Sequence, residues 1–347
     1  MATIKDVAEE CHLSVTTVSL VLNNKPNRIS EKTKQKILET AKKLHYQPSQ
    51  IAISMITKKT QTVGLILPDI SNLYFAALAH AIEEECASYG YTVVYGNTSD
   101  HINQDFEYLS SFLARGVDGL IFIHSNSFGE ENQKKLLEMT ENSNTPVLAV
   151  DRSFHSPKIP SVIVDQYAGG YEATKHLLDL GHRKIGCITG PENVNNSSER
   201  LRGYRRALED AGIPYNPALV ITGDFHAPSG SLAVPVLLKQ RVTGIFACND
   251  MMAIGVYQAC RDMGISIPKD LSVVGFDDIF FSQYLDPPLS TVYQPVTEIG
   301  KEAARQVIAM INKDYTPGKK TVFLPSLNIR ESSGLCLSEK KEGGKIG

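Results

Sequence analysis

A short stretch near the start of the chain carries side chains suited to contacting DNA bases. If a helix begins after Ser14, four of them lie on the face opposite its apolar stripe: Val15, Thr16, Ser19 and Leu20. Hydroxyl groups bond base edges or phosphates, and methyl-bearing side chains touch thymine methyl groups in the major groove. A solvated helix face has a similar composition, so the pattern alone leaves both interpretations open.

Three short helices are expected to position this face. Their predicted N-terminal caps are Thr3, Ser14 and Ser30, each followed by apolar residues at helical spacing. In the third helix, the pattern predicts that Ile37 and Leu38 both point inward. Residues 1–60 contain ten Lys/Arg and five Asp/Glu, a net charge of +5, whereas the remaining residues have 25 against 33, or −8. This asymmetry indicates a nucleic-acid contact in the first sixty residues of an otherwise acidic protein.

From residue 62 onward, short β-rich runs alternate with helical stretches, which is typical of parallel α/β sheets. The runs are 62–68, 91–97, 119–124, 147–151, 184–190, 244–249 and 271–277. Most of them end in Pro, Gly, Asn or Asp, so polar residues collect at the carboxyl edge, where open α/β sheets bind ligands. The chain has no nucleotide-binding glycine fingerprint, P-loop or nucleophile elbow, so we expect that it is not an enzyme.

Six cysteines, at positions 11, 86, 187, 248, 260 and 336, are scattered without a Cys-x-x-Cys pair or a histidine at metal-binding spacing. This usage predicts reduced, mostly buried thiols, with no disulfide, metal or cofactor. No apolar run approaches the roughly 20 residues of a membrane span, and the first residues lack the pattern of a secretory signal. We therefore expect a cytoplasmic protein without a membrane partner.

Two sets of motifs resemble the LacI/GalR (lactose-repressor) family. The first set is Thr3–Ala8, Ser14, Thr17–Ser19 and Val21–Asn23, and the second is Pro68–Asn72, Gly116–Gly119, Asp151–Arg152, Arg200–Tyr204, Asn249–Ala253 and Val274–Asp277. The resemblance implies an all-α helix-turn-helix headpiece and an α/β core like that of periplasmic binding proteins, with two doubly wound parallel-sheet lobes. We expect the headpiece at 1–48, a hinge helix or linker at 49–60 and an effector-binding and dimerisation domain at 61–340. Within that domain, the N-lobe is expected at 61–161 and 292–322, and the C-lobe at 162–291 and 323–340.

The resemblance also implies a larger set of DNA contacts. The set is Thr3, Ser14, Val15, Thr16, Thr17, Ser19, Leu20, Asn23, Ser30, Tyr46, Ala52 and Met55. Three positions depart from the family pattern. His12 stands where glycine is usual, and Leu20 stands where an arginine could bond guanine in a bidentate manner. Met55 can act as an apolar wedge in the minor groove, although Ile53, where arginine is frequent, keeps the interpretation of a plain linker open.

A sugar-binding cleft is implied by the same resemblance, and its residues closely match the ribose-binding pattern. The matching positions are Asn72, Tyr74, Phe75, Asp151, Arg152, Arg200, Phe225, Asn249, Asp277 and Gln294. Aromatic side chains suit the C–H faces of a sugar ring, and the polar groups can bond its hydroxyls. Two arginines balanced by two aspartates favour a neutral sugar over a sugar phosphate. Each residue taken singly has an ordinary structural role as well, such as core packing or helix capping.

Together these features predict a homodimeric repressor of a sugar-utilisation operon. A small neutral sugar, ribose by preference, is expected to release it from a palindromic operator. A transport binding protein would account for the cleft but not for the headpiece. The alternative within regulators is a carbon-catabolite regulator whose co-repressor is a phosphorylated carrier protein.

Overall fold

The chain divides into two compact units, Met1–Thr60 and Gln61–Gly347, which are described separately. The computed structural model describes residues 2–23, 28–47, 59–126, 128–154, 156, 158–192, 194–315, 318 and 320–336. The predicted DNA contacts Ala52 and Met55, and most of the predicted hinge, lie outside the described residues. In the part of the chain that is described, no helix has the length and apolarity needed to cross a membrane.

The described residues of the first unit form three helices, α1 (Ile4–Cys11), α2 (Val15–Leu22) and α3 (Glu31–Lys43). The predicted caps are confirmed, because the side chains of Thr3, Ser14 and Ser30 each accept a hydrogen bond from a backbone amide three residues later. A small core joins the helices, formed by Val7, Ala8, Cys11, Val18, Val21, Ile37 and Ala41. These helices therefore form a unit with a core of its own.

Two residues of this unit, His12 and Leu38, can be compared directly with what the sequence pattern predicted. His12 has a φ of 53°, so it adopts the left-handed turn conformation that glycine takes more easily. The expectation that Leu38 points inward is wrong, because 54% of Leu38 is exposed. Ile37 occupies the core-facing position, and the next residue of a helix lies about 100° further around it.

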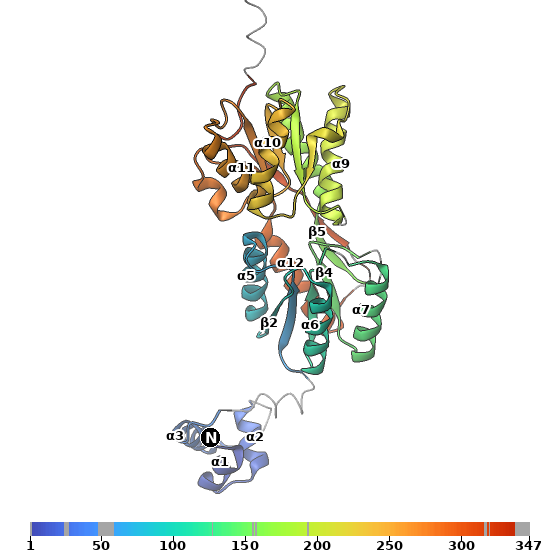
Figure 1. Cartoon of the computed structure of the whole chain (residues 1–347). Coiled ribbons are helices and arrows are strands. Elements are labelled where there is room, and N and C mark those ends of the chain that lie inside the picture. Colours follow the sequence, from blue (N-terminus) through green and yellow to red (C-terminus); the bar gives the residue numbers. More distant parts are fainter. Residues whose placement is uncertain are drawn as a thin grey trace, which may run out of the picture. The chain divides into compact units, whose positions relative to one another are not determined.

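The second unit contains two six-stranded sheets, each covered by helices. The first sheet has the order β11-β5-β4-β3-β1-β2 and defines the first lobe (Figure 1). Its strands are β1 (Thr62–Leu67), β2 (Thr92–Asn97), β3 (Gly119–Phe122), β4 (Val147–Val150), β5 (Ser161–Val164) and β11 (Lys320–Phe323). Its helices are α5 (Leu73–Ser88), α6 (Ile102–Ala114), α7 (Glu130–Ser143) and α12 (Val296–Ile311). Leu65 and Ile66 belong to different apolar clusters, as expected for a strand whose successive side chains are buried on opposite faces.

The second sheet repeats this arrangement, in the order β12-β10-β9-β8-β6-β7. Its strands are β6 (Ile185–Thr189), β7 (Val220–Thr222), β8 (Gly244–Ala247), β9 (Ser272–Asp277), β10 (Ser290–Tyr293) and β12 (Ser326–Asn328), the last antiparallel to β10. The helices of this second lobe are α8 (Gln166–Asp179), α9 (Asn195–Asp210), α10 (Ala227–Lys239) and α11 (Asp250–Met263), with short 3-10 turns at Pro217–Leu219 and Phe280–Tyr284. In each sheet the strand order reverses beside the strand that comes first in the sequence, which is β1 in the first sheet and β6 in the second. Doubly wound folds bind ligands at this point.

Within the part of the second unit that the structure describes, the chain crosses between the lobes three times. The crossings expected after residues 161, 291 and 322 fall inside β5, β10 and β11, so these boundaries need correction. Each strand completes its pairing with its own sheet before the chain leaves the lobe, which places the crossings after Val164, Tyr293 and Phe323.

Candidate functional site

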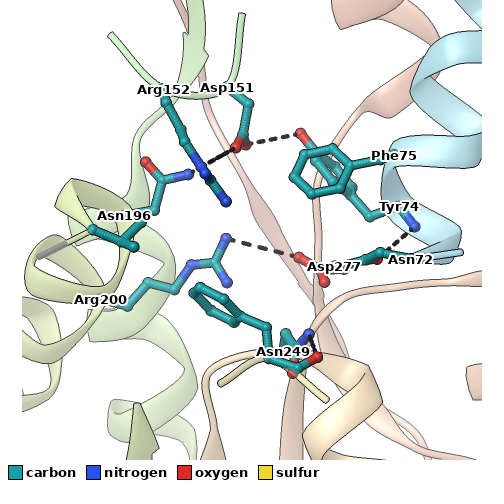
Figure 2. Close-up of a pocket in the computed structure, with 11 residues that line it drawn as sticks. Asn72, Tyr74, Phe75, Asp151, Arg152, Asn196, Arg200, Asn249 and Asp277 are labelled. Atoms are coloured by element: carbon teal, nitrogen blue, oxygen red, sulfur yellow. Dashed lines mark hydrogen bonds and ion pairs between the residues drawn. The ribbon is translucent and has the colours of Figure 1, made fainter. Parts of the chain in front are cut away.

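A cavity of about 30 Å³ lies at the carboxyl ends of the strands in the second unit (Figure 2). It is lined by Asn72, Tyr74, Phe75, Asp151, Arg152, Val194, Asn196, Arg200, Phe225, Asn249 and Asp277. The structure therefore brings together every expected ligand-binding residue except Gln294.

One wall of the cavity is aromatic and comes from the start of α5. Asn72 caps this helix by accepting a hydrogen bond from the backbone amide of Tyr74 at 3.1 Å. The rings of Tyr74 and Phe75 then meet edge to face, with centroids 5.4 Å apart. The hydroxyl of Tyr74 donates to Oδ1 of Asp151 at 3.3 Å, and burial raises the pKa of Tyr74, so this hydroxyl keeps its proton.

The turn after β4 supplies an ion pair. Nε of Arg152 lies 3.8 Å from Oδ2 of Asp151, while Nη1 donates to the carbonyl of His124 at 2.5 Å and lies 3.5 Å from Oδ1 of Asp100. Burial raises the pKa of Asp151, and the guanidinium groups of Arg152 and Arg200 offset part of that rise. Asp151 itself has a φ of 63°, a backbone strain that is tolerated where surrounding contacts hold the turn in place.

A second ion pair joins α9 to the end of β9. Nη2 of Arg200 lies 3.7 Å from Oδ1 of Asp277, and its guanidinium stacks 3.7 Å from the ring centroid of Phe276. Arg200 also donates to the side chain of Gln166 and to the carbonyl of Cys248. Burial raises the pKa of Asp277 well above its ordinary value, although the charge of Arg200 opposes this rise. Figure 2 shows both ion pairs among the residues that line the cavity.

Gln294 does not line the cavity and lies fully buried behind Asp277. Its amide donates to Oδ1 of Asp277 at 2.8 Å, and its carbonyl oxygen accepts from Gln166 at 3.3 Å. Gln294 thus holds Asp277 directly, and it holds Arg200 through Gln166. We correct the expected direct contact to a supporting role.

Phe225 enters the cavity from the turn after β7. Its backbone adopts a φ of 69°, and its carbonyl oxygen accepts a hydrogen bond from the side-chain amide of Asn249 at 2.9 Å. The other end of the same amide caps α11 by accepting from the backbone of Met252. Asn249 therefore fixes both the start of α11 and the turn that carries the aromatic ring.

Asn196 and Val194 were not among the predicted residues, although both line the cavity. The amide of Asn196 donates to Oδ2 of Asp151 at 3.1 Å, which links the second lobe to the first. Asn196 stands four residues before Arg200 on α9, so the two share one helix face. That spacing was a signal available in the sequence.

The predicted DNA-contacting residues within the described part of the chain lie at three kinds of position. Thr3, Ser14 and Ser30 cap the three helices, and Tyr46 packs against the core of the first unit. The remaining ones are on or just after α2: Val15, Thr16, Thr17, Ser19, Leu20 and Asn23. Val15 and Thr16 are exposed, whereas Asn23 bonds to Ser19 through its side-chain amide at 2.9–3.1 Å. Helix α2 thus presents a mixed hydroxyl and apolar surface.

The described residues contain no group of three or more His, Cys, Asp or Glu side chains placed to hold a metal ion. Five of the six cysteines are buried, as expected, and Cys336 is partly buried. Burial raises the pKa of Cys260 to about 11 and that of Cys86 to about 12, so both thiols stay protonated at neutral pH.

Two family descriptions match the chain. "Bacterial regulatory proteins, lacI family" matches residues 3–49, and "Periplasmic binding protein-like domain" matches residues 174–333. The HTH-type transcriptional repressor PurR of Aliivibrio salmonicida is 34% identical over 334 residues, with 96% of this chain and 99% of that protein covered. Catabolite control protein A of Priestia megaterium is 36% identical over 335 residues, covering 95% and 99%. The ribose operon repressor of Haemophilus influenzae is 34% identical over 334 residues, covering 96% and 98%.

Solved structures resemble the chain in both units. A lac repressor dimer bound to operator and an anti-inducer has a TM-score of 0.86 at 26% identity, covering 96% of this chain and 99% of that one. A LacI family transcriptional regulator from Enterococcus faecium with bound ribose has a TM-score of 0.72 at 29% identity, covering 79% and 99%.

Proposed function

This chain belongs to the lacI family of bacterial regulatory proteins, and from that premise we propose that it is a homodimeric repressor released from a palindromic operator by ribose. The headpiece at residues 1–48 would read the operator through α2, and the hinge at 49–60 would connect it to the effector-binding domain at 61–340. Two-fold symmetry of a dimer would pair with two half-sites about one helical turn apart.

The composition of the cavity wall carries the proposal. Two arginines face two aspartates, Arg152 with Asp151 and Arg200 with Asp277, so the formal charge of the wall is balanced. A phosphorylated sugar would need a surplus of positive charge, whereas a neutral polyol can bond to all four groups. The rings of Tyr74 and Phe75 offer apolar faces to the sugar ring. A ribose operon repressor among the relatives, and a structural neighbour with bound ribose, support ribose as the first ligand to test.

Both lobes contribute to this wall, which suggests how a ligand would act on DNA binding. Asn72 and Asp151 come from the first lobe, and Arg200 and Asn249 come from the second. A ligand that bonds both lobes favours the arrangement in which they are close. The ligand can shift the balance between the two arrangements of the lobes only by the difference in its affinity for them. Operator affinity can therefore change no more than this shift allows.

Operator affinity measured with and without saturating D-ribose tests the proposal. Sites selected from random-sequence DNA by the purified protein would supply the operator. We expect a palindromic site, affinity that falls steeply with salt, and weaker binding when ribose is added. Ribose 5-phosphate is the matched control and is expected to have no effect. If ribose does not bind, or if it tightens operator binding, the proposed release by ribose is wrong.

A second candidate is a catabolite regulator, which the 36% identity to catabolite control protein A favours. In that case a phosphorylated carrier protein, rather than a sugar, would change operator affinity. The same DNA-binding assay separates the two candidates, because a co-repressor strengthens operator binding whereas ribose is expected to weaken it.

A further inference from the structure

Two buried glutamines lie where the chain crosses between the lobes. Gln166 is the second residue after β5 and begins α8, and Gln294 is the first residue after β10. Gln166 is 5% exposed and Gln294 is fully buried. The amide of Gln166 donates to the carbonyl oxygen of Gln294 at 3.3 Å, although the two residues are 128 positions apart in the sequence. This glutamine pair therefore joins two of the crossings directly.

The packing around Gln166 fixes its place. The backbone amide of Asp165, one residue earlier, donates to the carbonyl of Phe323 at 2.9 Å, and the chain makes its last crossing after Phe323. One helical turn beyond Gln166, Gly170 lets α8 approach α9 closely, because a Cβ built there would come within 2.2 Å of the backbone oxygen of Arg200. Residues four apart share a helix face, so this close approach also brings Gln166 within reach of Arg200.

The glutamine pair belongs to a ring of four polar side chains, which Arg200 and Asp277 complete. Nε of Arg200 donates to Oε1 of Gln166 at 2.8 Å, and Nε2 of Gln294 donates to Oδ1 of Asp277 at 2.8 Å. Because an arginine can only donate, it determines which end of the Gln166 amide faces it, and this in turn determines how the Gln294 amide is turned. Each amide thus has a single orientation that satisfies all three hydrogen bonds.

The fourth edge of the ring is the one a ligand can reach. Nη2 of Arg200 and Oδ1 of Asp277 are 3.7 Å apart, whereas a hydrogen bond spans about 2.7–3.2 Å. Both of these side chains line the cavity, but Gln166 and Gln294 do not. A ligand hydroxyl that bonds to Arg200 and Asp277 together would close this edge. It would then act on the same ring that joins the crossings.

We propose that Gln166 is a positioning residue that, together with Gln294, transmits ligand binding at Arg200 and Asp277 to the crossings between the lobes. The identity of the ligand rests on the proposed function, whereas the link between the crossings does not. A ligand that closes the ring favours one arrangement of the crossings, and hence one angle between the lobes. Breaking the glutamine pair therefore reduces the effect of bound ligand on operator affinity, and not only the affinity for the ligand.

Operator affinity of the full chain, measured with and without saturating D-ribose, tests this role. In Gln166→Leu, the ribose-induced change in operator affinity is expected to be at least about fivefold smaller than in the wild type, since couplings between sites typically begin at about that size. Gln166→Glu is the sharper variant, because an ionised carboxylate still accepts from Arg200 but cannot donate to Gln294. It should bind ribose more tightly than Gln166→Leu does and still lose the response.

Gln306→Leu is the matched control. Gln306 is also buried, but it bonds to Glu302 and Thr321 within the first lobe, so this variant should respond to ribose as the wild type does. The double variant Gln166→Leu/Gln294→Leu should respond like Gln166→Leu alone, because both changes break the same ring. If saturating ribose produces the wild-type response in Gln166→Leu and Gln166→Glu, Gln166 only supports Arg200, and the proposed link is wrong.

Hydrogen exchange of the ligand-free chain keeps the link testable if ribose does not bind. Gln166→Leu should raise deuterium uptake in residues 290–298, and Gln294→Leu should raise it in residues 161–168. Each variant is thus examined at the crossing to which it does not belong, and Gln306→Leu should change neither. These changes without ribose binding would support the link and count only against the proposed ligand. Unchanged uptake at the opposite crossing in both variants would rule out the link, whatever the effector is.

Discussion

The ring of Phe225 occupies the space where a side chain on Gly190 would lie. A Cβ built on Gly190 would come within 2.0 Å of Cζ of Phe225, far closer than carbon atoms approach one another. Gly190 follows β6, and Phe225 follows the neighbouring strand β7, so the glycine gives the aromatic ring its place in the cavity wall.

Gly190→Ala is therefore expected to displace Phe225 and weaken ribose binding while leaving operator binding in the absence of ribose unchanged. Overpacking of this kind costs about 1–3 kcal/mol of stability. Calorimetry with ribose and thermal unfolding would measure the two effects. Gly129→Ala is the control, because no atom lies within 4 Å of a Cβ built there. Wild-type ribose affinity in Gly190→Ala would argue against Phe225 as part of the binding site.

Arg200→Ala is expected to remove the response to ribose and to destabilise the second unit. Asp277 would be left buried beside an empty space, and breaking a buried pair costs about 3–5 kcal/mol. Operator binding without ribose should persist. Arg202→Ala, on the exposed side of the same helix, should change stability by at most about 1 kcal/mol and respond to ribose normally. Denaturant unfolding and operator titrations with and without ribose would compare the two variants.

The stability of the second unit is expected to depend on pH through Asp250. This fully buried carboxylate accepts hydrogen bonds from Thr291, Ser282 and the backbone of Ile279, yet burial raises its pKa from 3.8 to about 6. As pH rises from about 4 to 6, the unfolded chain loses this proton while the folded chain retains it. The contribution of Asp250 to stability therefore falls by about 3 kcal/mol across this window and is constant above it.

Unfolding of Asp250→Asn at several pH values would measure this contribution. The difference in unfolding free energy between wild type and variant should decline from pH 4 to pH 6 and then level off. Asp262→Asn, near the exposed end of the same helix, is the control and should track the wild type. A difference that is constant with pH would show that Asp250 does not titrate in this range.

Leu20→Arg is expected to change which operator is preferred. An arginine on α2 can bond guanine in a bidentate manner, which is worth about 1–3 kcal/mol of discrimination at one base pair. Leu38→Arg adds the same charge on the exposed surface of α3 and should strengthen binding to all sequences alike. Selection of binding sites from random DNA would distinguish a new guanine from a general gain in affinity. If both variants select the wild-type site, Leu20 does not face the bases.

The sequence pattern predicted the helices of the first unit and seven strands of the second, namely β1, β2, β3, β4, β6, β8 and β9. Strands such as β7 and β12 were not predicted, because three residues are too few to display an alternating pattern. The cavity residues could be named because their positions match the sugar-binding positions of the LacI/GalR family. The strand pattern alone predicted only that polar side chains would collect at the carboxyl edge of a sheet. The supporting role of Gln294 could not be predicted, because it depends on side-chain contacts with Gln166 and Asp277 from distant segments.

The three crossings between the lobes also determine the order in which the units of a newly synthesised chain can finish folding. The core of the first unit is finished once Ala41 has been made, whereas the core of the first lobe includes residues from Val63 to Ile308. At roughly 5–20 residues per second, α12 leaves the ribosome roughly 10–50 s after β1. The helix-turn-helix unit is thus complete while the first sheet still lacks α12 and its edge strand β11. Translation that ends before Val296 would release a chain with an intact DNA-reading unit and no finished lobe to regulate it.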